Sequence, residues 1–198
     1  MIPIRDTQTS TCFPVVTYLL MGINLMVFLF QVQLGFDAES FFYLYGLVPA
    51  KYTVPEMSRH FTWTNHLVSA FSYMFLHGGF MHFIGNMWSL YIFGDNVEEH
   101  FGSFRFLGFY LVCGLLSGLL HFVVHPLSMV PTIGASGAIA GVMGAYFILY
   151  PRSRILTLIP IIIIPWFVEI PAFVFLGIWF LLQFLNAAGS GAAAGVAW

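Results

Sequence analysis

The sequence predicts an all-α membrane protein, a polytopic bundle of apolar helices. Of its 198 residues, 60% are hydrophobic and only 7% are charged. The mean hydropathy of +0.90 is far above the value that a soluble domain of this length tolerates. The net charge of −2 rests on few ionisable groups, and no basic stripe is present. We therefore expect an integral, multi-pass protein whose partner is the lipid bilayer and not a nucleic acid.

Five apolar segments are candidates to cross a hydrocarbon core of roughly 30 Å. They cover residues 13–34, 79–93, 104–124, 136–150 and 170–185. The first segment is too long, and too poorly flanked by cleavage-type residues, to be a removable signal peptide. Since no soluble domain or internal repeat is evident, we interpret residues 1–198 as a single transmembrane domain.

Two connecting segments differ in character from the spans. Residues 35–77 are rich in aromatic side chains and carry Lys51, Arg59 and Trp63, which is typical of an interfacial, partly helical loop. Residues 157–168 contain two prolines around four isoleucines, and are too short and too broken by proline to span a membrane. We expect a hairpin or a re-entrant piece at the membrane surface there.

The basic residues predict the orientation of the bundle. With the N-terminus inside, short cytoplasmic segments carry Arg5, Arg105, Arg152 and Arg154. Lys51 and Arg59 then fall in the long outer loop, where charge has less influence on topology. The sequence therefore predicts a cytoplasmic N-terminus and an outer position for residues 125–133, just before the fourth span.

A serine between glycines opens the fourth span, in the stretch Gly134-Ala135-Ser136-Gly137. Pro151 marks the inner interface fifteen residues later, which is roughly 22 Å along a helix and short of a core of about 30 Å. Ser136 is therefore expected below the outer surface, in a wet pocket that opens outward. The helix start also favours the negative charge of a tetrahedral intermediate.

The glycines near Ser136 have a packing interpretation as well. Gly137, Gly141 and Ala145 recur every four residues, and this spacing of small residues lets two helices approach closely. We expect the face with Gly137 and Gly141 to pack against a helix beyond the five spans.

The second span carries a polar stripe. His82, Asn86 and Ser89 lie at i, i+4 and i+7, so they share one helix face, which should point into the bundle. On its own, this stripe is better explained by hydrogen bonds between helices. Together with Ser136 as a nucleophile, the side-chain donors of His82 and Asn86 make a plausible oxyanion hole with the Ser136 N–H.

Other membrane chemistries fit less well. His77 and His82 are five residues apart and no His-Glu-x-x-His motif is present, so no zinc or other metal site is expected. A protease with paired aspartates needs two of them in different spans, and Asp95 has no such partner. Neither a ring of charges nor repeat-related broken helices point to a channel or transporter.

These motifs together resemble the rhomboid intramembrane serine proteases, and the resemblance covers nearly the whole chain. Residues 1–6 and 13–17 are similar to a common prokaryotic rhomboid opening, and residues 75–87 resemble the second-helix motif. Gly94, Glu98 and Gly102 resemble the G-x3-E-x3-G stretch that follows, and residues 134–137 resemble the G-x-S-G nucleophile motif.

The resemblance implies a rhomboid-like fold with six core helices, about five of which are present, and a Ser-His dyad. It implies that Ser136 is the nucleophile, that His82 and Asn86 stabilise the oxyanion, and that His77 is structural. It further implies a serine endopeptidase of the prokaryotic inner membrane that cleaves transmembrane segments of other membrane proteins and needs no cofactor.

The family pattern differs from this chain in three places. The base histidine of the family lies in a motif like A-H-x-x-G on the last helix, whereas this chain reaches Trp198 without it. In some members an aromatic residue takes the place of Ala140, and an arginine follows the tryptophan that matches Trp63. We therefore expect the domain to be incomplete at its C-terminus, the base to lie beyond residue 198, and residues 1–198 alone to be inactive.

Two questions stay open at the level of sequence. His121 and His125, at the outer end of the third span, are the only histidines here that could stand in for the base. The alternative function is a non-catalytic rhomboid-like protein that binds transmembrane helices without cleaving them. The intact Ser136 and its glycines favour the protease.

Overall fold

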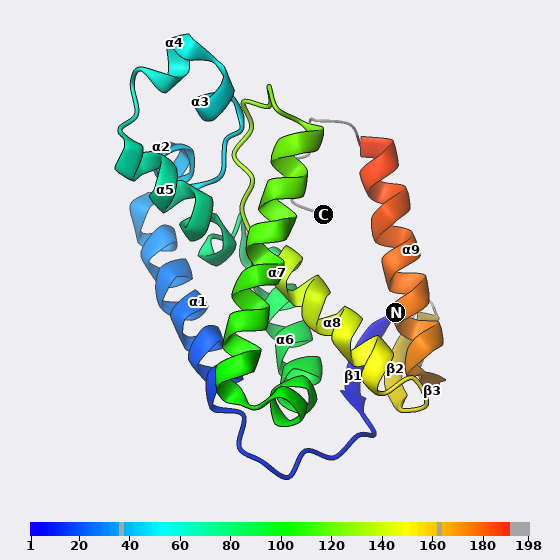
Figure 1. Cartoon of the computed structure of the whole chain (residues 1–198). Helices are drawn as coiled ribbons and strands as arrows, with labels where there is room; N and C mark the ends of the chain where they lie inside the picture. The colour runs from blue at the N-terminus through cyan, green and yellow to red at the C-terminus, as the bar shows by residue number, and fades with distance from the viewer. Residues whose placement is uncertain (36–37, 162–163, 191–198) are drawn as a thin grey trace.

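The computed structural model describes residues 1–35, 38–161 and 164–190 as a helical bundle with a small sheet at one end (Figure 1). The helices are α1 (Val15–Leu34), α2 (Ala38–Tyr45), α3 (Ala50–Thr53), α4 (Pro55–Ser58), α5 (Trp63–Ser72), η2 (Tyr73–Phe75), α6 (Phe80–Phe101), α7 (Ser103–Val124), α8 (Ser136–Leu149) and α9 (Ala172–Ser190). The strands are β1 (Ile2–Asp6), β2 (Arg154–Ile161) and β3 (Ile164–Pro171).

Each of the five predicted spans coincides with a helix, namely α1, α6, α7, α8 and α9. Among the described residues, α1 and α7 are each long and apolar enough to cross a membrane. The segment α5–η2 and α6 pass the same test as a pair, although they meet at an angle of 75°, and α8 and α9 are shorter apolar helices. The prediction of a helical membrane bundle is confirmed.

The predicted interfacial loop contains α2 to α5, which gather at the end of the bundle opposite the sheet (Figure 1). Its Lys51 is not a solvated charge, because only 1% of the residue is exposed. The Lys51 ammonium lies 4.5 Å from the ring centre of Phe61 and 5.5 Å from that of Tyr43, and it donates to the Leu44 carbonyl at 3.2 Å. Burial lowers the pKa of Lys51 to about 8.

The predicted hairpin is present and is longer than residues 157–168. Strands β2 and β3 pair antiparallel along their whole length, and β1 adds to the other side of β2, giving the order β1-β2-β3. Ile155 and Thr157 of β2 are fully buried, so one face of this strand is covered. The bundle thus carries a three-stranded sheet of which only the hairpin was expected.

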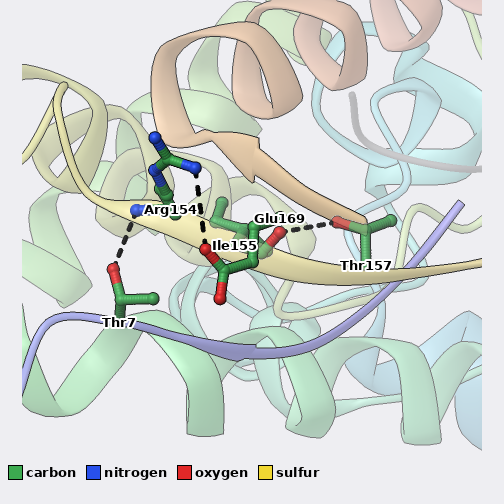
Figure 2. A network of polar contacts seen from close by, with 5 residues as sticks. All are labelled: Thr7, Arg154, Ile155, Thr157 and Glu169. Atoms are coloured by element: carbon green, nitrogen blue, oxygen red, sulfur yellow. Dashed lines mark hydrogen bonds and ion pairs between the residues drawn. The ribbon is translucent and has the colours of Figure 1, made fainter. Parts of the chain in front are cut away.

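Figure 2 shows polar contacts within and between these strands. The Arg154 N–H donates to Thr7 Oγ1 at 2.9 Å, which holds the end of β1 against β2. The Arg154 guanidinium pairs with Glu169 of β3 at 3.7 Å, and Thr157 Oγ1 donates to the Ile155 carbonyl at 3.0 Å. Because the Arg154–Glu169 pair is largely exposed, it contributes only about 0–1 kcal/mol.

The G-x3-E-x3-G stretch joins α1 to α6. Glu98 is 3% exposed and accepts from the backbone N–H of Val16 at 2.9 Å and that of Thr17 at 2.8 Å. These N–H groups lack partners within the first turn of α1, so the carboxylate caps that helix. An added Cβ at Gly94 would lie 3.0 Å from Thr17, and Gly102 turns the chain into α7 with a φ of 78°. The stretch therefore lets α1 pack closely on α6 and lets the chain turn back from α6 into α7.

Helix α8 packs on α7 through its small residues. An added Cβ at Gly137 would collide with Ser117 of α7, and one at Gly141 would collide with Cys113. The expectation that this glycine face packs against a helix beyond the five spans is therefore wrong. Since α7 carries short side chains at both contact points, the two helices approach closely and leave no room there for another helix.

Candidate active site

The loop in front of Ser136 is held by backbone hydrogen bonds. Ser136 is the first residue of α8, and Gly134, two residues earlier, donates its N–H to the Tyr73 carbonyl at 2.9 Å. Thr132 and Leu47 exchange two backbone hydrogen bonds of 2.8 and 3.0 Å. These contacts tie the loop to η2 and to the segment after α2, so the scaffold fixes the place where α8 begins.

Gly134 lies close to the side chains of both His82 and Ser136. An added Cβ at Gly134 would lie 2.8 Å from both Cε1 and Nε2 of His82, and 3.5 Å from Ser136 Oγ. The imidazole on α6 and the hydroxyl on α8 therefore both lie near this point. The φ of 131° at Gly134 is one that side-chain-bearing residues rarely adopt.

The hydrogen bonding of His82 makes its Nε2 a donor. Nδ1 accepts from the Gly78 N–H in a long hydrogen bond of 3.5 Å, which leaves the proton of the neutral ring on Nε2. Nε2 is buried, and no acceptor for it lies among the described residues. An N–H group therefore lies beside Gly134.

Asn86 lies one turn after His82 on the same face of α6. Its residue is 8% exposed, and its Nδ2 is buried without an acceptor in the described part of the chain. A buried donor without an acceptor costs about 1–3 kcal/mol, so native proteins seldom keep one unless a ligand or an ordered water binds it. Two such donors on one helix face are suited to an oxygen that gains negative charge.

His77 is held as part of the framework. It is 1% exposed, its backbone N–H donates to Gln31 Oε1 at 3.1 Å, and its carbonyl accepts from Gln31 Nε2 at 2.8 Å. The imidazole lies edge-on to the ring of Phe83, with ring centres 5.3 Å apart. These contacts join the start of the second-helix motif to α1.

A cavity of about 550 Å³ adjoins the imidazole of His82. The residues from Gly78 to His82 line it, and Met81 at its rim is 84% exposed. Ser136 does not line this cavity and is itself half-buried. The cavity beside His82 is therefore not the pocket that the sequence predicts around Ser136.

The two histidines that could stand in for the general base lie at the end of α7. His121 and His125 have ring centres 5.2 Å apart at the end of that helix, and His121 Nε2 is buried without a partner among the described residues. Ser117 lies one turn before His121 and abuts Gly137, the neighbour of Ser136. The sequence did not single out Ser117, since a serine in an apolar helix carries no signal of which helix it faces.

Comparisons with known proteins point to the same family as the sequence motifs. A family model described as the Rhomboid domain matches residues 64–198. Rhomboid protein 1, mitochondrial, of Saccharomyces cerevisiae is 33% identical over 144 residues, which are 70% of this chain and 38% of the yeast protein. Two Bacillus subtilis proteins match shorter stretches. Putative rhomboid protease YdcA is 39% identical over 71 residues, covering 36% of this chain and 35% of that protein.

The second Bacillus subtilis relative, Rhomboid protease GluP, is 43% identical over 70 residues, covering 35% of this chain and 13% of that protein. The match to each of these three relatives therefore spans 38% of its length or less.

Proposed function

The chain belongs to the rhomboid family, and from this premise we propose that it is an intramembrane serine endopeptidase. Its substrates are transmembrane segments of other membrane proteins. Ser136 is the nucleophile, and His82 and Asn86 stabilise the oxyanion. The observation that carries the proposal is the approach of His82 Nε2 and Ser136 Oγ to the same point beside Gly134.

The chemistry assigns a separate task to each group. Ser136 Oγ attacks the scissile carbonyl carbon while a general base takes the hydroxyl proton. The carbonyl oxygen becomes an anion that accepts from His82 Nε2–H, Asn86 Nδ2–H and the Ser136 backbone N–H. The proton then passes to the leaving amine as the C–N bond breaks. Water hydrolyses the acyl-enzyme by the same steps and frees Ser136.

We assign the general base to a histidine outside residues 1–198. The described surroundings of the histidines support this assignment. His82 is engaged through Nδ1 with Gly78, and His77 is enclosed between α1 and α6. The resemblance to the family implies a base in an Ala-His motif on a helix after the fifth span. A serine hydroxyl is a weak nucleophile until a general base removes its proton.

The apolar helices and the family establish an integral membrane protein. The further proposal is a prokaryotic inner membrane with the N-terminus in the cytoplasm, supported by the arginines near the ends of the spans. In this orientation α8 begins on the outer side, and the cavity beside His82 opens there.

The experiment that tests the proposal is cleavage of a transmembrane substrate in vesicles by the chain continued through the Ala-His segment. Ser136→Ala should abolish cleavage and leave thermal stability nearly unchanged, since losing one half-buried hydroxyl creates little cavity. The matched control is Ser89→Ala, which removes a half-buried serine on α6 from outside the Gly134 neighbourhood. Cleavage by Ser136→Ala at the unmodified rate would eliminate Ser136 as the nucleophile.

A further inference from the structure

A second cavity, of about 450 Å³, lies at the other end of α6. Its walls come from β1, from the segment that joins β1 to α1, and from the first turn of α1 and the last turns of α6. Asp95, which lines it, is thirteen residues after His82, which is about 20 Å along a helix. This cavity is therefore separate from the proposed active site.

A row of exposed aromatic rings borders this cavity. Ring centres of Phe13 and Tyr18 are 5.2 Å apart, those of Tyr18 and Tyr91 are 6.5 Å apart, and those of Tyr91 and Trp88 are 6.2 Å apart. Each of these four residues is at least 40% exposed. Exposed tyrosine and tryptophan side chains at one level of a membrane bundle mark the headgroup region, so the cavity opens where lipid headgroups lie.

The cavity also carries charges of both signs that are not paired with each other. Asp6 accepts from Asn96 Nδ2 and the Tyr146 hydroxyl, and Asp95 accepts from the Asn96 N–H, so each carboxylate has neutral partners only. Within the described residues, neither Asp6 nor Asp95 forms a salt bridge, and Arg5 forms none either. Each carboxylate keeps further lone pairs available to a donor.

We propose that this cavity binds the headgroup of a phospholipid with a primary ammonium, such as phosphatidylethanolamine. The ammonium donates hydrogen bonds to Asp6 and Asp95 and lies near the rings of Tyr18 and Tyr91, which favour a cation. The phosphate lies toward Arg5, and the acyl chains follow the exposed apolar surface of α1. A choline headgroup fits less well, because its quaternary ammonium has no N–H to donate to the two carboxylates.

The reactivity of the Cys12 thiol can report whether a headgroup occupies this cavity. Cys12 is an exposed free thiol that lines the cavity, whereas Cys113 is a free thiol on α7, beside Gly141 of α8. A headgroup bound in the cavity covers Cys12 and leaves Cys113 unaffected. The rate of alkylation of Cys12 relative to that of Cys113 therefore reports occupancy within one molecule.

The test measures this ratio for the chain in vesicles of phosphatidylcholine alone and in phosphatidylcholine mixed with phosphatidylethanolamine or with phosphatidylglycerol. At pH 8, phosphatidylethanolamine should slow the alkylation of Cys12 several-fold compared with the other two compositions. Asp95→Asn keeps an oxygen for the Asn96 N–H but removes the charge, and it should abolish this protection. The control Glu56→Gln, an exposed carboxylate in α4, should keep it.

Three outcomes would overturn the proposal. Equal alkylation rates in all three compositions would mean that no headgroup is selected. Stronger protection by phosphatidylglycerol would assign the cavity to an anion bound by Arg5. Protection by phosphatidylethanolamine that persists in Asp95→Asn would show that the carboxylate does not bind the ammonium.

Discussion

Replacing Gly134 with alanine tests the geometry of the candidate active site. The new Cβ would lie 2.8 Å from the His82 ring and 3.5 Å from Ser136 Oγ, and the φ of 131° disfavours any side chain. The backbone strain costs about 1–3 kcal/mol. The His82 ring must also move, and loss of one oxyanion donor typically lowers turnover by about 10²- to 10³-fold. We therefore expect Gly134→Ala to reduce turnover by about that factor.

Gly144→Ala, within α8, is the matched control. The nearest atom to an added Cβ at Gly144 is Phe180 Cζ at 3.9 Å, which is an ordinary contact. Alanine in a helix interior is more favourable than glycine by roughly 0.5–1 kcal/mol, so this variant should keep its turnover and its stability.

The assay is the rate of cleavage of a transmembrane substrate in vesicles, together with a thermal melt of each variant. A Gly134→Ala protein that melts as a folded protein and cleaves at the unmodified rate would refute the placement of His82 beside Ser136. A Gly144→Ala protein with the same loss of turnover would show that the assay responds to any added methyl group in α8.

Three further predictions follow from particular side chains. His82→Ala should lower turnover with little change in stability. His77→Ala should lower the melting temperature, because only His77 is enclosed against α1. A folded His77→Ala protein that loses more turnover than His82→Ala would exchange the roles of the two histidines. Burial raises the pKa of Asp6 to about 6 from 3.8, so the folded state binds a proton more tightly and stability should fall as pH rises from about 4 through about 6. Asp6→Asn should remove that part of the pH dependence, as melts across this range can show. A cysteine that replaces Met129 should react with an impermeant thiol reagent outside intact cells, and a cysteine that replaces Arg152 should not. The opposite pattern would mean that the orientation of the bundle in the membrane is the reverse of the predicted one.

The helices could be predicted because hydropathy and helix length are local properties of the chain. Each predicted span matches a helix, including α8, whose start at Ser136 is the residue expected from the glycine pattern. Strand β1 could not be predicted in this way, because it pairs with residues about 150 positions later. The burial of Lys51 could not be predicted from local sequence either. Its burial depends on Phe61 and Tyr43, and no local pattern places these rings around an ammonium.

The residues of the candidate site are a prediction from the sequence, whereas their distances and neighbours come from the fold. Polarity on an apolar helix singled out His82 and Asn86, and the motif around Ser136 singled out the serine. The position of Gly134 close to both His82 and Ser136 depends on a contact between α6 and the loop before α8. The pairing of the glycine face of α8 with α7 depends in the same way on Ser117 and Cys113, which are small but carry no motif.

The role of Ser136 as nucleophile can be tested by reaction with a fluorophosphonate, with the modified residue located by peptide mass spectrometry. We expect a covalent adduct on Ser136 when the segment with the Ala-His motif is present, even as a separately expressed fragment, and no adduct on residues 1–198 alone. An adduct on Ser136 in residues 1–198 alone would mean that a histidine already present, most plausibly His121 or His125, serves as the base. No adduct on Ser136 in either preparation would contradict the claim that Ser136 is a nucleophile.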